Sequence, residues 1–118
     1  RHLAALAAQT IVVTNDEPTS LTDAYALIKL LTQDGARTRI GVVVNAAASK
    51  AEGERTYKTL AKACDTFLKI TPPLVGVVRR DAKVRDAIRH QTPILTRHPS
   101  CDAARDIAAI AQRIAQSS

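Results

Sequence analysis

The chain alternates short, continuous apolar runs with longer segments in which apolar residues recur at helical spacing. Three of the runs are rich in β-branched residues and are bounded by turn or cap residues, namely residues 10–14, 40–45 and 74–78. Because these runs show no alternation with polar residues, each is predicted to be a strand of a sheet that is covered on both faces.

A helical pattern follows the first two strands. The first helix is predicted to begin at Ser20, whose Ser-x-x-Asp spacing to Asp23 fits a capping box, and to stop at Gly35. The second is predicted to end before Pro72 and Pro73. Its expected apolar face consists of Tyr57, Leu60, Ala61, Cys64, Phe67 and Leu68.

Two more helices are predicted after the third strand. One covers about residues 82–90, and after a short extended link the other begins near Ser100. The expected apolar stripe of the last helix consists of Ala104, Ile107, Ala108, Ala111 and Ile114. Residues 1–8 are expected to be the end of a helix that leads into the first strand.

This order of elements predicts an α/β fold with parallel strands joined by right-handed crossovers. Repeats and linkers are not apparent, so residues 1–118 are expected to form a single domain. In open parallel sheets, ligands bind beyond the carboxyl ends of the strands. The polar triplets at residues 15–17, 45–47 and 79–81 are therefore predicted to lie together on one edge of the sheet.

Several kinds of chemistry are not indicated by the sequence. Neither GxxxxGK[ST] nor GxGxxG occurs, so a backbone nest for phosphates is not predicted. The two cysteines lie far apart without a zinc spacing, and a catalytic triad pattern is not recognisable, so no catalytic or metal-ligating residue is assigned. The chain has only three aromatic residues, which argues against a base-stacking surface. An apolar run of about 20 residues is missing, so we expect a cytoplasmic protein.

A formal net charge of +6 arises from 17 basic and 11 acidic residues. The charge is concentrated in residues 79–97, which contain Arg79, Arg80, Lys83, Arg85, Arg89 and Arg97. Such a segment suits phosphates, nucleic acid or anionic lipid, and the alternative interpretation is a solvated helix face.

Three stretches carry a family resemblance: "IVVTNDEPTSLTDAYALIKLL", "RIGVVVNAAASKAEGERTYKTLAKACDTFLKI" and "LVGVVRRDAKVRDAIRHQTPILTRHPSCDAARDIAAIAQRIA". Together they resemble the C-terminal half of a MinD/ParA-type P-loop ATPase. Within that family they look like the MinD-like group that regulates flagellar number, in which Glu-Pro-Thr-Ser-x-x-Asp-Ala-Tyr follows a strand. The resemblance covers almost the whole chain. It implies part of a P-loop NTPase fold, which is Rossmann-like and has three layers. In that family the phosphate loop and two magnesium-sensing switch segments belong to an N-terminal half that this sequence does not contain.

The resemblance also implies roles for particular residues. Asn45 stands where the family recognises the adenine of ATP, and Arg80 and Asp81 match a segment that runs along the base and ribose. Glu17 and Asp23 belong to a rim that faces the nucleotide and the partner subunit of an ATP-dependent dimer. The alternative interpretations are that Asn45 caps the turn before the second helix and that Asp81 caps the helix at residue 82, a role that is compatible with nucleotide binding.

Two positions depart from the family pattern. Asp16 and Arg79 stand where the family usually has proline. Replacing a rigid residue by a charged, flexible one is expected to change the wall against which adenine would pack.

The resemblance implies a homo-oligomeric switch that uses ATP with magnesium and acts on flagellar assembly or regulatory proteins, at a cell pole or peripherally at the membrane in the intact protein. The chain itself is expected not to hydrolyse ATP, and direct membrane binding is not expected, because no basic segment with bulky apolar residues is present. The alternative function is a non-enzymatic basic α/β module that binds DNA or acidic protein. We also expect an exposed sheet edge to cause self-association.

Overall fold

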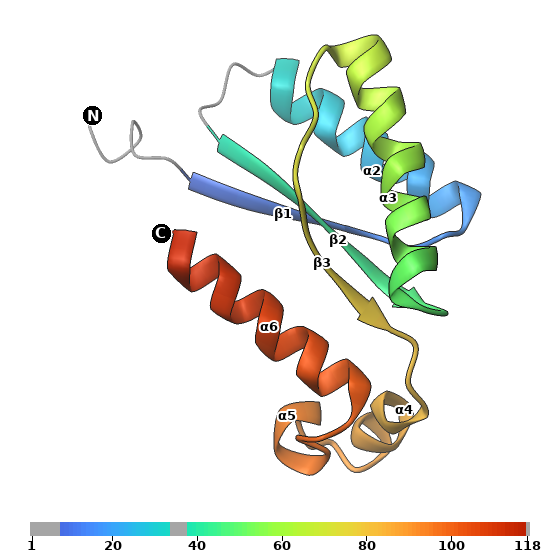
Figure 1. The fold of residues 1–118 in the computed structure, drawn as a ribbon, viewed down its shortest axis with the longest axis vertical. Helices are drawn as coiled ribbons and strands as arrows, with labels where there is room; N and C mark the ends of the chain where they lie inside the picture. The colour runs from blue at the N-terminus through green and yellow to red at the C-terminus, as the bar shows by residue number, and fades with distance from the viewer. Residues whose placement is uncertain (1–7, 34–37, 118) are drawn as a thin grey trace.

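The protein is an α/β sandwich with a three-stranded sheet between two layers of helices (Figure 1). The computed structural model describes residues 8–33 and 38–117. The elements are β1 (Ala8–Thr14), α2 (Pro18–Gln33), β2 (Thr38–Ala47), α3 (Lys50–Ala63), the π-helical turn η1 (Cys64–Leu68), β3 (Leu74–Arg79), α4 (Ala82–Arg89), α5 (Ile94–Arg97) and α6 (Asp102–Ser117). This arrangement confirms the predicted α/β class.

The sheet has the order β1-β2-β3, and both strand pairs are parallel. Successive residues of a strand point to opposite faces, so Val12 and Val42 pack against α2 and α3 while Val43 and Val75 pack against α6. The prediction of burial on both faces holds for β2 and β3 and is wrong for part of one face of β1. Val13 is 58% exposed, whereas Ile11 on the same face is partly buried in the cluster that includes residues of α6.

The first helix begins at Pro18, so the capping box predicted at Ser20 is wrong. Proline suits the first helical position because its missing N–H has no partner there in any case. Ser20 Oγ instead accepts a hydrogen bond from Asn15 N and shares another with Thr14 Oγ1, each 3.1 Å long. The first turn of α2 is thereby tied to the end of β1. The stop predicted at Gly35 lies outside the described residues, as do residues 1–7 of the helix predicted over residues 1–8. Ala8, the last residue of that prediction, belongs to β1.

The second helix ends in a π-helical turn that the sequence did not predict. Cys64 is fully buried, as expected, and burial raises the pKa of its thiol. A π-helical turn holds one more residue than an α-helical turn, which rotates the residues that follow it around the helix axis. The expected burial of Phe67 is therefore wrong, since the side chain is 72% exposed. The turn ends at Leu68, before Pro72.

The last two predicted helices are both present, but the link between them and the inward face of the second differ from the prediction. Residues 82–90 form α4 to within one residue, but the link predicted to be extended contains α5. In α6, Ala108 and Ala111 are exposed, and the stripe that packs inward includes Ala103, Asp106 and Ile110 in their place. Ile110 can lie against β3 because Gly76 has no Cβ, which would collide with the isoleucine side chain.

None of the helices in the described ranges is both long enough and apolar enough to cross a membrane.

The outer edge of β1 leads to the first prediction. Among the described residues, β1 pairs only with β2, and Val13 of this edge strand exposes apolar surface. We expect the chain to self-associate, because an unprotected strand edge is a template for further pairing. Val13→Lys should shift the population towards monomer in light scattering coupled to size-exclusion chromatography.

Leu95→Lys is the matched control. Leu95, like Val13, is an exposed branched apolar residue, but it lies on α5 and not on β1. It should leave the association unchanged. A wild-type chain that stays monomeric over a wide concentration range would contradict the prediction.

Candidate functional site

The predicted base-side residues Asn45, Arg80 and Asp81 line one cavity at the carboxyl end of the sheet. Asn45 comes from β2, and the other two follow β3 directly. The cavity has a volume of about 460 Å³. Its other lining residues are Ala46, Val78, Arg79, Ala82, Val84, Arg85 and Ile88. The structure therefore brings together three residues that are up to 36 positions apart, 81 − 45, in the sequence.

Asn45 lies in a bulge of β2. The register shifts between Val44 and Ala47, so that Asn45 and Ala46 both lie opposite Val78 of β3, and Ala46 has a φ of 56°. A bulge of this kind re-aims side chains at the end of a strand. The Asn45 side chain is exposed and makes no hydrogen bond with another described residue. The alternative interpretation, in which Asn45 caps the next helix, is wrong: Ser49 is the cap, and its Oγ accepts from Glu52 N at 3.1 Å.

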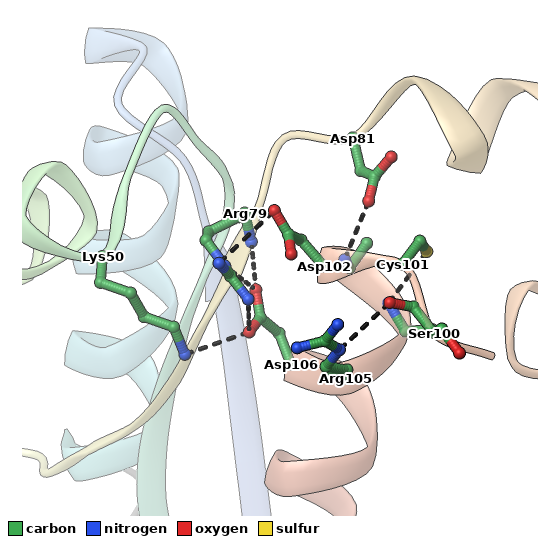
Figure 2. Close-up of polar contacts among 10 residues, drawn as sticks. Lys50, Arg79, Asp81, Ser100, Cys101, Asp102, Arg105 and Asp106 are labelled. Atoms are coloured by element: carbon green, nitrogen blue, oxygen red, sulfur yellow. Dashed lines mark hydrogen bonds and ion pairs between the residues drawn. The ribbon is translucent and has the colours of Figure 1, made fainter. Parts of the chain in front are cut away.

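Asp81 joins two helices at the wall of the cavity. Its Oδ1 accepts a hydrogen bond from Lys83 N at 2.9 Å, and its Oδ2 accepts from Ala103 N at 3.1 Å (Figure 2). The capping role predicted for Asp81 is confirmed, and the bond to α6 was not predicted. Because the backbone N–H groups of Lys83 and Ala103 stabilise the carboxylate, the pKa of Asp81 is held below its ordinary value. Arg80 N donates to Ala47 O at 2.7 Å, which fixes the bulge against the end of β3.

Arg79 is held by Asp106 of α6. Its backbone N–H, Nε and Nη2 donate hydrogen bonds to the Asp106 carboxylate at 2.8, 3.0 and 3.1 Å (Figure 2). The expectation that an arginine at this position would be flexible is therefore wrong. The backbone bond is one that a proline, which lacks an N–H, cannot make.

Asp106 also binds Lys50, at the start of α3. Its Oδ1 lies 3.1 Å from Lys50 Nζ, and the Asp106 side chain is only 3% exposed. Burial opposes ionisation of Asp106, but the hydrogen bonds from Arg79 and Lys50 outweigh it, so the pKa of Asp106 lies below its ordinary value. The network joins α6 to the end of β3 and to the loop that follows Asn45, and it thereby fixes two of the segments that line the cavity. Asp106 was not predicted from the sequence. An aspartate between Ala103 and Ile107 interrupts the apolar stripe of the helix and could have indicated a buried partner.

Glu17 and Asp23 line a second cavity, which lies between β1 and α2. Its volume is about 630 Å³, and it is also lined by Ile11, Val12, Val13, Thr19, Ser20, Ala24 and Leu27. Because the strands are parallel, Glu17 lies at the same end of the sheet as Asn45 and Asp81, as predicted. It is nevertheless on the β1 side of β2, so the two sets of residues line separate cavities.

The basic segment is partly neutralised within the fold. Arg79 pairs with Asp106, and Arg97 Nε lies 2.8 Å from Asp86 Oδ2. The hydrogen bonds from His98 and Arg97 hold the pKa of Asp86 well below its usual range. Four other cations of the segment are exposed and form no ion pair with another described residue, namely Arg80, Lys83, Arg85 and Arg89.

Across residues 8–33 and 38–117, no group of three or more histidine, cysteine, aspartate or glutamate side chains could hold a metal ion.

Two curated proteins are similar in sequence to this chain over most of its length. The chain is 41% identical to the antiactivator FleN of Pseudomonas aeruginosa over 108 residues, which cover 92% of this chain and 39% of FleN. It is 33% identical to an uncharacterised ATP-binding protein of Methanocaldococcus jannaschii over 104 residues, which cover 88% of this chain and 36% of that protein. The chain therefore spans less than half the length of these relatives. No model of a known protein family matches it.

Solved structures with the same fold include MinD proteins. The cell division ATPase MinD of Pyrococcus furiosus superposes with a TM-score of 0.71 at 21% identity, over 93% of this chain and 43% of that one. The septum site-determining protein MinD of Pyrococcus horikoshii, complexed with Mg-ADP, gives a TM-score of 0.69 at 21% identity, over 90% of this chain and 40% of that one. The predicted partial P-loop NTPase fold is confirmed by these likenesses.

The buried carboxylate of Asp106 leads to the second prediction. Asp106→Asn should lower the free energy of unfolding at neutral pH by about 1–3 kcal/mol, because Arg79 and Lys50 lose a charged acceptor. Since the folded pKa of Asp106 is lowered, its ionisation stabilises the fold above the ordinary pKa of about 4, and this contribution disappears as the pH falls through the folded value. Urea unfolding at several pH values should show the wild type losing its advantage over the variant in acid.

Asp102→Asn is the matched control. Asp102 also approaches Arg79, with Nη1 and Oδ2 3.5 Å apart, but its side chain is 56% exposed. Its replacement should change the free energy of unfolding by no more than about 0.5 kcal/mol. Equal effects of the two substitutions would show that the burial of Asp106 does not matter.

Proposed function

We propose that this chain, which is similar in sequence to FleN and has the fold of MinD proteins, forms the adenine-recognising and dimer-facing part of a MinD-like ATPase that regulates flagellar number or placement. The observation that carries the proposal is the convergence of Asn45, Arg80 and Asp81 on one cavity, with the Asn45 carboxamide unoccupied by any described residue. Residues 1–118 would then be the C-terminal portion of one MinD-like ATPase domain.

The lining of the cavity suits a purine base. Val78, Val84 and Ile88 provide apolar surface for the ring, and the Asn45 carboxamide offers one acceptor and two donor hydrogens. Such a group pairs with the N6 and N7 edge of adenine in one plane. Guanine carries an acceptor where adenine carries the N6 donor, so the same pairing distinguishes the two bases.

Arg80 and Asp81 would contact the ribose. Each Asp81 oxygen already accepts one backbone hydrogen bond, which leaves lone pairs that a ribose hydroxyl can use. Arg80 is exposed at the same cavity. The phosphates and magnesium of ATP would need groups that these 118 residues do not provide, since the sequence contains no phosphate-loop motif. We therefore expect this chain alone not to hydrolyse ATP.

The rim formed by Glu17 and Asp23 would face the nucleotide and the partner subunit in an ATP-dependent dimer. The relatives support a regulatory ATPase, because FleN is an antiactivator and the MinD of Pyrococcus furiosus is a cell division ATPase. We place the intact protein in the cytoplasm, with recruitment to a cell pole or peripherally to the membrane, and its partners among flagellar assembly or regulatory proteins.

The third prediction tests the base site. In ¹⁵N NMR titrations with ADP, resonances of Asn45 and of residues 78–81 should shift, and GDP should bind more weakly. Asn45→Ala should weaken ADP binding about tenfold or more and reduce the preference over GDP, because the paired edge of adenine loses its partner.

Gln112→Ala is the control, since Gln112 is an exposed carboxamide on α6 that does not line the cavity. It should leave the titration unchanged. ADP and GDP shifts of equal size, or ADP shifts that are insensitive to Asn45→Ala, would contradict the assignment of Asn45.

A second candidate function is the binding of DNA or acidic protein by the basic segment. The observation in its favour is that Arg80, Lys83, Arg85 and Arg89 are exposed on or next to α4 without an acidic partner among the described residues. Cations in this arrangement bind phosphates without reading sequence.

The fourth prediction separates this candidate from the first. DNA binding measured by fluorescence anisotropy should fall steeply between about 50 and 200 mM salt and should be lost in the double variant Arg85→Glu with Arg89→Glu. Lys58→Glu on α3 is the control and should have little effect. Undetectable or salt-insensitive binding would remove this second function and leave the nucleotide proposal untouched.

A further inference from the structure

A groove between α2 and the end of α3 lies away from both cavities at the edge of the sheet. Leu21, Thr22 and Tyr25 of α2 form one wall. The other wall, from α3 and η1, consists of Thr59, Leu60, Ala63 and Phe67. We call this feature the Phe67 groove. Its volume is about 410 Å³, which is within the range of binding pockets.

Exposed aromatic surface distinguishes the Phe67 groove from the rest of the molecule. Phe67 is 72% exposed, and its ring meets that of Tyr25 edge to face with centroids 6.5 Å apart. The chain has only three aromatic residues, and two of them lie here. Apolar side chains that are exposed together beside a hollow are one feature of interaction sites.

The backbone accounts for the exposure of Phe67. The π-helical turn η1 begins at Cys64, which is fully buried, and it rotates Phe67 out of the core three residues later. Such turns occur often at functional sites. The phenylalanine is thus held outward by regular structure, while Tyr25 is fixed opposite to it on α2.

The shape of the groove fits a helix. Its two walls are helices that lie side by side on the same face of the sheet (Figure 1), so no strand edge is available there for an added strand. An apolar channel between two helices accepts the apolar stripe of an amphipathic helix.

The charges at the rim indicate what kind of helix. Lys29 lies one turn beyond Tyr25 on α2, and Lys62 lies three residues beyond Thr59 on α3. Both lysines are exposed and form no ion pair with another described residue. In a symmetric contact between two copies of this chain, the same lysines would face each other and repel.

From these observations we propose that the Phe67 groove binds an amphipathic helix of another protein, with acidic residues beside its apolar stripe. Phe67 and Tyr25 would contact the apolar stripe, and Lys29 and Lys62 would pair with the acidic residues. This surface would act independently of the nucleotide site, because its residues belong to α2, α3 and η1 and none of them lines the base-side cavity.

The fifth prediction uses a designed peptide as the probe. The peptide has about 18 residues, with leucines at i, i+3, i+4 and i+7 spacing and glutamates on either side of them. In ¹⁵N NMR titrations it should shift resonances of Leu21, Tyr25 and Phe67, and a peptide with lysines in place of the glutamates should bind more weakly. Phe67→Ala should reduce the affinity for the acidic peptide about tenfold or more.

Leu30→Ala is the matched control variant, because Leu30 is 63% exposed on α2 but does not line the groove. It should bind the peptide as the wild type does. Phe67→Ala should retain the wild-type circular dichroism and melting temperature, since the side chain it shortens is mostly exposed. The double variant Lys29→Glu with Lys62→Glu should prefer the basic peptide, a reversal that general damage to the fold would not produce.

Four outcomes would overturn the proposal. They are the absence of binding, equal binding of the acidic and basic peptides, shifts located elsewhere, and binding that Phe67→Ala does not weaken. Sedimentation with phosphatidylglycerol vesicles provides the last arm. Co-sedimentation that depends on Phe67, without peptide binding, would assign the groove to a lipid surface instead.

Discussion

The buried carboxylate of Asp106 is the interaction on which the carboxyl edge of the sheet depends. It accepts three hydrogen bonds from Arg79 and pairs with Lys50, so one side chain of α6 holds the end of β3 and the start of α3. A carboxylate that is 3% exposed is tolerated only where charged donors compensate its lost hydration. Since Lys50 follows the loop after Asn45 and Arg79 precedes Arg80 and Asp81, the same pairings determine how these segments lie around the cavity.

The backbone near Asn45 complements this network. The bulge at Asn45 and Ala46 interrupts the β2–β3 ladder, and Arg80 N restores a connection by donating to Ala47 O. Asp81 then fixes the first turns of α4 and α6 to one another. The groups that serve the fold are thereby separated from those that are free to bind: Asp81 and Arg79 are engaged, whereas the carboxamide of Asn45 has no partner among the described residues.

Local physical chemistry explains which features could be predicted from the sequence. The strands were found because continuous β-branched runs depend only on their own residues, and the parallel order brought Asn45 and Asp81 to one end of the sheet. The features that were missed depend on distant partners or on helix register. Ser20 resembles a cap in sequence, yet its hydroxyl bonds to the end of β1, and Phe67 follows the apolar spacing of α3 until the π-helical turn shifts it.

The arginine at position 79 shows how a residue other than proline can be fixed in place beside the cavity. A proline restricts φ by its own ring and needs no partner, whereas an arginine needs one that holds both its backbone and its side chain. Asp106 meets both needs, because Oδ2 accepts from the backbone N–H and from Nε while Oδ1 accepts from Nη2. The two positions therefore depend on each other physically: a neutral residue at position 106 would leave Arg79 without its bidentate partner beside the cavity. The rigidity that the family resemblance assigns to a single proline is provided here by a pair of residues 27 positions apart.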